Sequence, residues 1–222
     1  EHVKPLLAKE GIDLKIVEFT DYNTPNLSLA DKELDANFFQ HVPYMNEFAK
    51  AHNLKLVSAG SVHVEPMGVY SKKIKSLSEL KDGDKIAIPN DQTNGGRALI
   101  LLDKLGLIKL KDPANILSTV NDIVENSHNY QFIELEAAQL PRSFDDITVS
   151  VINTNYALEA GLNPTADSLA LESKDSPYVN ILTVRAGEEN NPAIKKLVAA
   201  LQSEDTKKFI EEKYKGAILP AF

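Results

Sequence analysis

The chain has 222 residues, 43% of them hydrophobic and 25% charged, which is ordinary globular composition and enough for one large α/β unit or two lobes. A net charge of −8 argues against a nucleic-acid partner, which would require a basic face. The absence of cysteine excludes disulfides, thiolate metal sites and cysteine nucleophiles. No apolar run approaches the roughly 20 residues that span a bilayer, and no signal peptide is recognisable.

The first third of the chain predicts helices and strands in alternation. A helix is expected over residues 1–10, followed by Gly11, which suits the left-handed conformation at a helix C-terminus. The run LKIVEF at 14–19 is rich in strand-forming side chains and predicts a strand. Further elements expected in this part are a short helix from residue 26, a brief strand or turn at 35–41, a helix with Pro43 in its first turn, and strands at 55–59 and 67–70.

A second run of alternating elements begins at residue 85, which indicates an α/β fold with mostly parallel sheets covered by helices. The turn-rich stretch 76–84 is the candidate for a crossover between two lobes, and the loop 173–179 is the candidate for the return. Lobe 1 would then comprise 1–82 and 178–222, and lobe 2 would comprise 83–177. The strands expected in this part are 85–88, 132–136, 148–152 and 180–185, and the helices are 97–106 and one near the C-terminus that contains residues 194–201.

One candidate binding segment follows a strand and opens a helix, at NDQTNGGR (90–97). A helix start offers backbone N–H groups to an anion, and the two glycines would allow a ligand close to the backbone. Arg97 could hold a carboxylate through two parallel hydrogen bonds. The spacing matches neither a Walker A loop nor a dinucleotide-binding loop. A glycine-rich turn with a solvated arginine explains the segment about equally well.

Aromatic and amide side chains form two further candidates. DANFFQHVPY carries Phe38, Phe39, His41 and Tyr44, and neighbouring residues of a strand point in opposite directions, so one phenylalanine at most faces a given pocket. Taken alone, these residues are best interpreted as aromatic side chains of the core. The functional interpretation is that they clamp a polarisable side chain of a ligand, together with Tyr22. Asparagine carbonyls could accept hydrogen bonds from an ammonium group, although loop asparagines usually bond to their own backbone. The asparagines in question are Asn153, Asn155 and Asn180.

The sequence gives little support to catalysis. The histidines show no zinc spacing, and no nucleophile elbow is present. His63 and Glu65 would share one face of a strand, but a single pair of this kind is a common coincidence. We therefore expect no enzyme activity, no metal and no cofactor.

Taken together, the segments resemble the NlpA/MetQ-type lipoproteins, the methionine-binding proteins of ABC importers. The resemblance runs in order along nearly the whole chain. It is carried by DANFFQHVPY, HVEPMGVYSKKIKSLSELKDGDKIAIPND, TNGGRALILL, ELEAAQLPRSFDD, VINTNYA and DSPYVN.

The resemblance implies an α/β, two-lobed type II periplasmic-binding-protein fold with a ligand cleft between the lobes. It implies L-methionine as ligand, an ABC permease and its ATPase as partners, and an extracytoplasmic position held by an N-terminal lipid anchor. Arg97 would bind the α-carboxylate, and Asn153 and Asn180 the amino and carboxylate groups. Tyr22, Phe39 and His41 would enclose the side chain, and Tyr44, Asn94 and His63 lie in matching segments.

Two features of the family pattern are missing from this sequence, namely a strand ahead of the helix at 1–10 and a lipidated cysteine upstream. We expect the strand to be removed or supplied by a neighbouring molecule. The cargo also stays open on sequence grounds, with glycyl-methionine, D-methionine or another amino acid as alternatives. Readings of a different class are the effector domain of a transcription regulator, an enzyme on an α/β scaffold and an adhesive surface protein.

Overall fold

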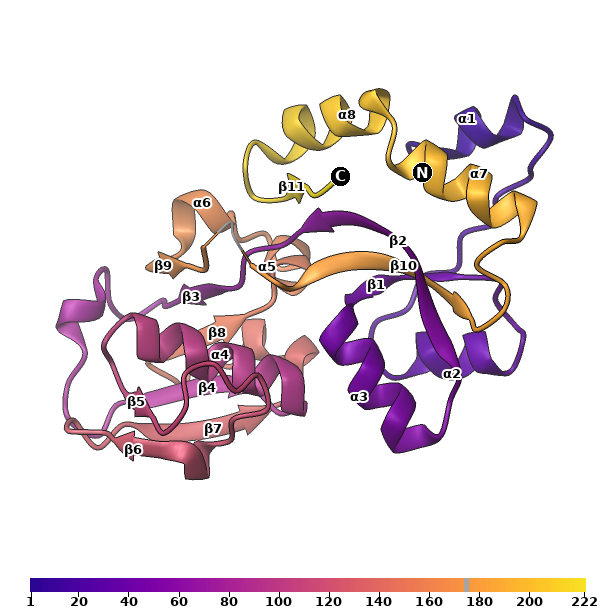
Figure 1. Cartoon of the computed structure of the whole chain (residues 1–222). Coiled ribbons are helices and arrows are strands. Elements are labelled where there is room, and N and C mark those ends of the chain that lie inside the picture. The colour runs from indigo at the N-terminus through magenta and orange to yellow at the C-terminus, as the bar shows by residue number, and fades with distance from the viewer. Residues whose placement is uncertain (174–175) are drawn as a thin grey trace. The chain divides into compact units, whose positions relative to one another are not determined.

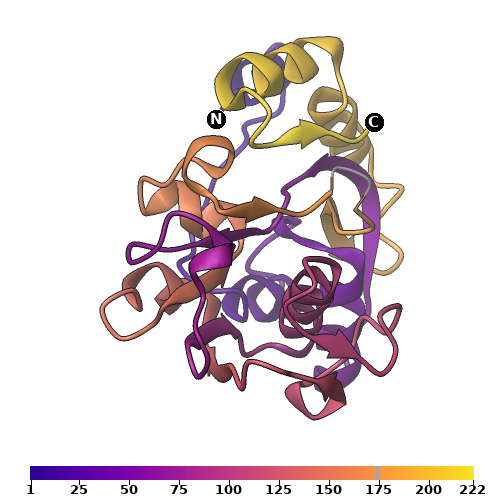
Figure 2. The same cartoon turned by 90° about the vertical axis from the view of Figure 1, so that its left-hand side faces the viewer.

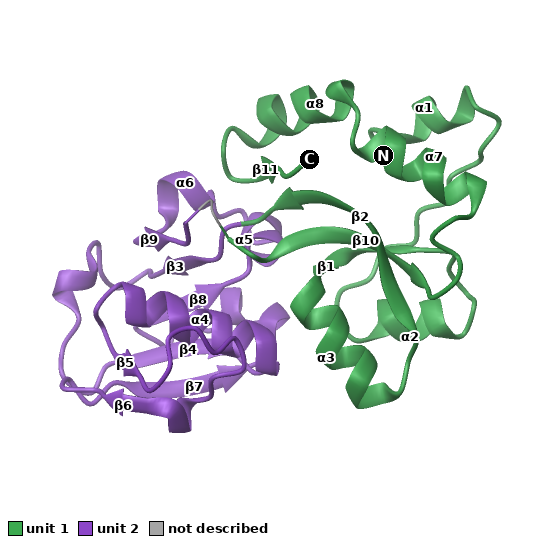
Figure 3. Cartoon of the chain, viewed as in Figure 1, with its two compact units in different colours: residues 1–65, 174–222 green, residues 66–173 purple. Residues whose placement is uncertain are grey.

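The computed structural model describes residues 1–173 and 176–222, which form two compact units (Figure 3). Unit 1 comprises residues 1–65 and 174–222, and unit 2 comprises residues 66–173. The chain therefore builds most of unit 1, forms the whole of unit 2, and then returns to complete unit 1.

Both crossings lie nearer the N-terminus than the sequence suggested. The first follows residue 65 rather than lying at 76–84, because β3 (Gly68–Tyr70) pairs with β8 (Val149–Ile152) and β9 (Ala170–Leu171) and so belongs to unit 2. The return falls at 173/174 rather than 177/178. Part of the predicted return loop, residues 174–175, lies outside the described residues.

The sheet of unit 1 has the order β1-β10-β2-β11 and is antiparallel at each described pairing. The prediction of mostly parallel sheets is wrong for this unit. Strand β2 leads the chain out of the unit and β10 leads it back in, so the two neighbours run in opposite directions. The strands are β1 (Asn37–His41), β2 (Leu56–Val64), β10 (Val179–Arg185) and β11 (Leu219–Pro220).

Helices cover both faces of this sheet (Figures 1 and 2). The side chains of alternate residues of β10 point to opposite faces of the sheet, as expected for a strand. Ile181 packs with the buried side chains under α2 (Thr24–Ala30) and α3 (Val42–His52), whereas Leu182 packs with those under α1 (Lys4–Ala8) and α7 (Pro192–Leu201). Helix α8 (Glu204–Tyr214) follows α7 and contacts β11.

The strand predicted at 14–19 is absent, and the segment is irregular. Ile16 is 42% exposed and Val17 58% exposed, although both favour strands. A strand is stabilised by a neighbour that pairs with its backbone N–H and C=O groups. Within the described residues no strand pairs with this segment, so its side chains alone do not make it a strand.

Unit 2 contains the parallel pairings that the sequence predicted. Its sheet has the order β7-β4-β8-β3-β9, with β4 (Lys85–Pro89) parallel to β7 (Gln131–Leu135) and to β8, and β3 antiparallel to its neighbours. Helix α4 (Gln92–Lys104) packs on one face through Ala98, Leu99 and Leu102. The other elements of the unit are η1 (Leu77–Glu79), β5 (Lys109–Leu110), η2 (Val120–Asp122), β6 (Ile123–Glu125), η3 (Ala137–Arg142), α5 (Thr154–Glu159) and α6 (Pro164–Asp167).

In the part of the chain that the structure describes, no helix is both long and apolar enough to cross a membrane.

Candidate functional site

In unit 1 the structure gathers Tyr22, Phe39, His41 and Tyr44, which we call the aromatic set. Ring centroids lie 5.8 Å apart between Tyr22 and Phe39, 6.0 Å between Phe39 and Tyr44, and 6.3 Å between His41 and Tyr44. The Tyr44 hydroxyl donates to the backbone carbonyl of Tyr22 at 2.9 Å, which ties the turn to the helix. The four residues predicted to share a wall are therefore neighbours.

Local backbone features explain how two members of this set are aimed. The β1–β10 register shifts between Phe38 and Gln40, so Phe39 is the extra residue of a β-bulge. A bulge redirects a side chain without breaking the rest of the ladder. His41 is the N-cap of α3, and its Nδ1 accepts the backbone N–H of Tyr44 at 3.2 Å. Its ring orientation is therefore fixed by the start of the helix.

Tyr178 is a member of this neighbourhood that the sequence analysis did not single out. It is 4% exposed, and its ring centroid lies 5.0 Å from that of His41. The signal was present in the motif DSPYVN, whose asparagine alone was assigned a role. A buried tyrosine two residues before Asn180 could have been selected from that motif.

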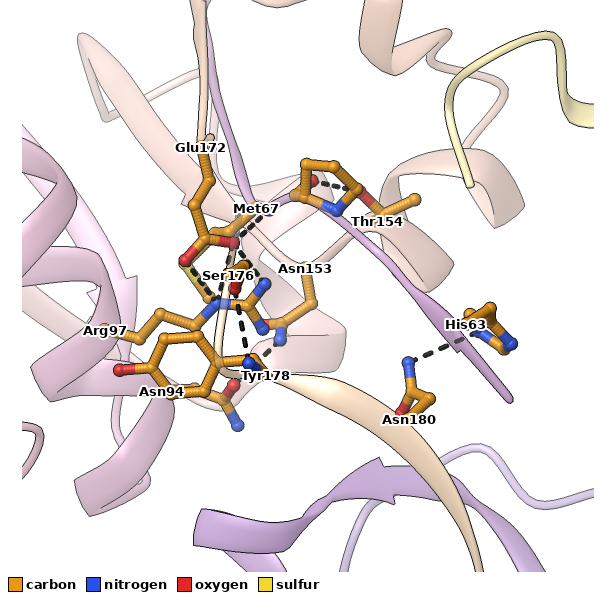
Figure 4. A network of polar contacts seen from close by, with 11 residues as sticks. His63, Met67, Asn94, Arg97, Asn153, Thr154, Glu172, Ser176, Tyr178 and Asn180 are labelled. Carbon is orange, nitrogen blue, oxygen red and sulfur yellow. Dashed lines mark hydrogen bonds and ion pairs between the residues drawn. The ribbon is translucent and has the colours of Figure 1, made fainter. Parts of the chain in front are cut away.

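Asn180 lies beside His63 on the neighbouring strand β2. The amide nitrogen of Asn180 is 3.3 Å from His63 Nε2, and the same Nε2 is 2.7 Å from the carboxylate of Glu65 (Figure 4 draws the first contact). His63 and Glu65 lie on the same face of the chain, as their spacing of two residues predicts. The His63–Glu65 pair, which could have been a coincidence of the sequence, is therefore present in the structure. It contacts Asn180, which is a predicted ligand-binding residue.

The start of α4 in unit 2 differs from the anion-binding turn that we expected. Asp91 is the N-cap, and its own carboxylate accepts the backbone N–H of Asn94 at 2.9 Å. The glycines serve packing rather than ligand approach. A Cβ on Gly95 would lie 2.9 Å from the Pro89 carbonyl, and one on Gly96 closer still to the backbone of Ile116. The helix start therefore already binds an anion of the chain itself.

A relay of hydrogen bonds continues from Asp91 to Asn153. The Asn94 amide nitrogen donates to both Asp91 oxygens at 3.0 Å, so its amide oxygen faces Asn153. The Asn153 amide nitrogen donates to that oxygen at 3.0 Å, and Figure 4 shows these two asparagines. A carboxylate only accepts, and this fixes the orientation of both amides. Asn153 Oδ1 is left buried and, among the described residues, has no hydrogen-bond partner. A ligand group that donates a hydrogen bond would satisfy this oxygen.

Arg97 lies in the same unit and is buried, with 3% of its surface exposed. It forms an ion pair with Glu172, in which Nη2 and the carboxylate oxygen Oε2 are 2.5 Å apart (Figure 4). The reading of Arg97 as a solvated surface arginine is wrong. Sequence reasoning missed Glu172 because it lies 75 residues away in a loop without a motif. We call Asp91, Asn94, Arg97, Asn153 and Glu172 the polar set.

Burial also affects the ionisation of Asp91. Desolvation raises the pKa of this carboxyl above its usual 3.8, while the hydrogen bonds from Asn94 and Thr93 oppose that rise. Within the described residues, no three histidine, aspartate or glutamate side chains are grouped as metal ligands.

Solved structures identify the class of protein to which this fold belongs. A nutrient-binding protein from Burkholderia cenocepacia bound to methionine superposes with a TM-score of 0.96 at 48% identity, covering 99% of this chain and 93% of that one. An ABC transporter periplasmic substrate-binding protein from Coxiella burnetii gives 0.95 at 44% identity, with 99% and 93% covered. The fold is that of the periplasmic substrate-binding proteins, as predicted.

The chain belongs to the NlpA lipoprotein family, whose model matches residues 1–222. The D-methionine-binding lipoprotein MetQ of Escherichia coli is 48% identical over 210 residues, which are 94% of this chain and 78% of that protein. This is a family of substrate-binding lipoproteins rather than of enzymes. Family membership confirms the predicted location, outside the cytoplasm and anchored to a membrane by lipid.

Proposed function

We propose that this protein binds L-methionine and delivers it to the permease of an ABC importer driven by a cytosolic ATPase. Three relatives support the proposal. One is a structure from Burkholderia cenocepacia described as bound to methionine, one is named for D-methionine binding, and one is described as belonging to an ABC transporter.

The observation that carries the proposal is the orphaned acceptor of Asn153. A buried polar atom without a partner costs free energy, about 1–3 kcal/mol, and the ammonium group of an amino acid would remove that cost. Arg97 supplies the complementary charge for the α-carboxylate through charge-assisted hydrogen bonds. A guanidinium has five N–H donors, and Glu172 accepts from Nε and Nη2 of Arg97.

The aromatic set supplies the chemistry for the rest of the ligand. A thioether sulfur gains about 0.3–1.5 kcal/mol against an aromatic ring, and Tyr22, Phe39 and Tyr44 offer rings in contact with one another. Asn180, whose amide nitrogen lies 3.3 Å from His63 Nε2, adds an amide for the polar end of the amino acid.

D-methionine is a second candidate, favoured by the name of the Escherichia coli relative. The enantiomers share the thioether side chain and both charged groups, so the two sets of residues suit either. They differ in the direction from which the ammonium group reaches Asn153.

Mass spectrometry of small molecules released from the denatured protein, followed by calorimetric titration of the stripped protein, tests this function. We expect released methionine and one-to-one rebinding of L-methionine, with D-methionine as the parallel titration. Tighter binding of D-methionine would replace the first candidate by the second. Binding of neither would contradict the proposed function.

A further inference from the structure

Glu172 holds one edge of the Arg97 guanidinium. Arg97 Nε donates to Oε1 at 3.1 Å and to Oε2 at 3.2 Å, and Nη2 donates to Oε2 at 2.5 Å. The backbone N–H of Met67 also donates to Oε2, at 3.2 Å, so the carboxylate is held from two sides (Figure 4). The Arg97 side chain is 4% exposed and the Glu172 side chain 9%. The pair is therefore a buried one, in which each charge depends on the other.

The charges of the polar set do not favour an anion. Among the described members of this set, a single cation, Arg97, lies with two carboxyl groups, those of Glu172 and Asp91. Arg97 is balanced by Glu172 before any ligand arrives. A bare arginine would attract any carboxylate, whereas this arginine presents donors without an excess of positive charge.

We propose that Glu172 is a specificity-determining residue, which makes the site accept zwitterionic amino acids and reject acids that lack an ammonium group. The inference rests on the proposed function and names a residue that decides its selectivity. An amino acid brings one positive and one negative charge, so the buried site gains no net charge. An acid without the ammonium group adds an uncompensated negative charge, and burying a charge without a partner is costly.

The relay to Asn153 sharpens this selection. The orphaned Oδ1 is an acceptor, which a hydroxyl can satisfy almost as well as an ammonium group can. A hydroxyl therefore restores the hydrogen bond but not the charge. Glu172 supplies the part of the selection that depends on charge alone.

The test compares two ligands that differ in this one respect, L-methionine and its α-hydroxy analogue, in which a hydroxyl replaces the ammonium group. Both are titrated by calorimetry into the wild type and Glu172→Gln. We expect the wild type to prefer methionine strongly and Glu172→Gln to lose at least about tenfold of that preference, or roughly 1.4 kcal/mol. Glu188→Gln is the matched control, because Glu188 pairs with Arg185 in unit 1 at 2.7 Å, and its preference should equal that of the wild type.

A merely structural role for Glu172 would weaken both ligands by the same factor in Glu172→Gln, and that result would overturn the inference. Glu172→Asp keeps the charge and decides the question if the glutamine variant does not fold. It should retain the preference of the wild type even if both affinities fall, and a lost preference there would also overturn the inference. A wild type that binds no methionine would instead refute the proposed function itself.

Discussion

The aromatic set of unit 1 and the polar set of unit 2 are built in different ways. Members of the aromatic set come from residues 22–44, and their rings pack on one another within about 6 Å. The polar set joins a helix start, the end of a strand and a loop, from residues 91, 153 and 172. The aromatic set is therefore made of residues that lie close together in the sequence. The polar set contains charged residues that are distant in the sequence and that the fold brings together.

This difference separates two kinds of energetic dependence. Packed rings lose contacts one at a time, so each substitution should cost little. A buried network of charges and amides is coupled, because removing one member leaves the next unsatisfied. We therefore expect the loss of a charged partner in the polar set to cost both binding and stability, and substitutions in the aromatic set to cost mainly selectivity.

The largest effect is expected for Arg97→Ala. It removes the partner of the ligand carboxylate, for a loss of about 2–5 kcal/mol of binding free energy. It also strands the buried carboxylate of Glu172, which should lower the free energy of unfolding by about 3–5 kcal/mol. Calorimetric titration and urea unfolding measure the two losses. Arg142→Ala is the control on an exposed arginine of the same unit, and equal losses in both variants would refute the role of Arg97.

Asn153→Ala should have the next largest effect, mainly on binding. It removes the acceptor for the ammonium group, which is worth about 1.5–3 kcal/mol for a hydrogen bond to a charged group, or roughly 10- to 100-fold in Kd. The loss of stability should be small, because the substitution removes the hydrogen bond to Asn94 but also removes the unsatisfied oxygen. Unchanged affinity for methionine would show that this oxygen does not face the ligand.

A smaller effect is expected for Phe39→Leu, which replaces an aromatic ring by an aliphatic group. The affinity for methionine should fall by about tenfold at most, the upper limit of one sulfur–aromatic contact. Norleucine, in which a methylene replaces the sulfur, should lose less, so the ratio of the two affinities is the informative measurement. Phe38→Leu is the matched control, since Phe38 packs on His63 and is 39% exposed. An equal loss for both ligands would assign Phe39 to shape rather than to sulfur recognition.

The smallest effect is expected for Asp91→Asn and concerns pH. Burial raises the pKa of Asp91, so the folded protein holds this proton more tightly than the unfolded chain. The stability that this proton contributes is complete below the unfolded pKa and is lost as pH rises through the folded one. Asparagine caps a helix as well and does not titrate. The variant should therefore gain stability relative to the wild type as pH rises above the usual aspartate pKa of 3.8, measured by urea unfolding. A constant difference would contradict the raised pKa.

Most of the fold could be predicted from the sequence, and so could the aromatic set, whose members lie close together in the sequence. The alternation of strands and helices predicted β3, β4, β7, β8 and α4 of unit 2 but not its shorter elements, and DANFFQHVPY predicted three of the four members of the aromatic set. The prediction of a strand at 14–19 was wrong, because β-forming residues make a strand only where a neighbouring strand pairs with them. A local sequence pattern does not show whether such a neighbour exists. Glu172 and the burial of Arg97 were missed for the same reason, since 75 residues separate the two partners. The glycines at 95 and 96 were misread because only the fold shows which backbone they approach.

The bulge at Phe39 has a consequence for how this family could change its cargo. Because Phe39 is the residue that the β1–β10 register skips, its backbone is not committed to the ladder in the way that Phe38 and Gln40 are. Its side chain can be exchanged for a larger or smaller one while the neighbouring pairs keep their partners. Under the proposed function, this position is therefore a place where a single substitution would change the ligand preference while the neighbouring strand pairs are kept.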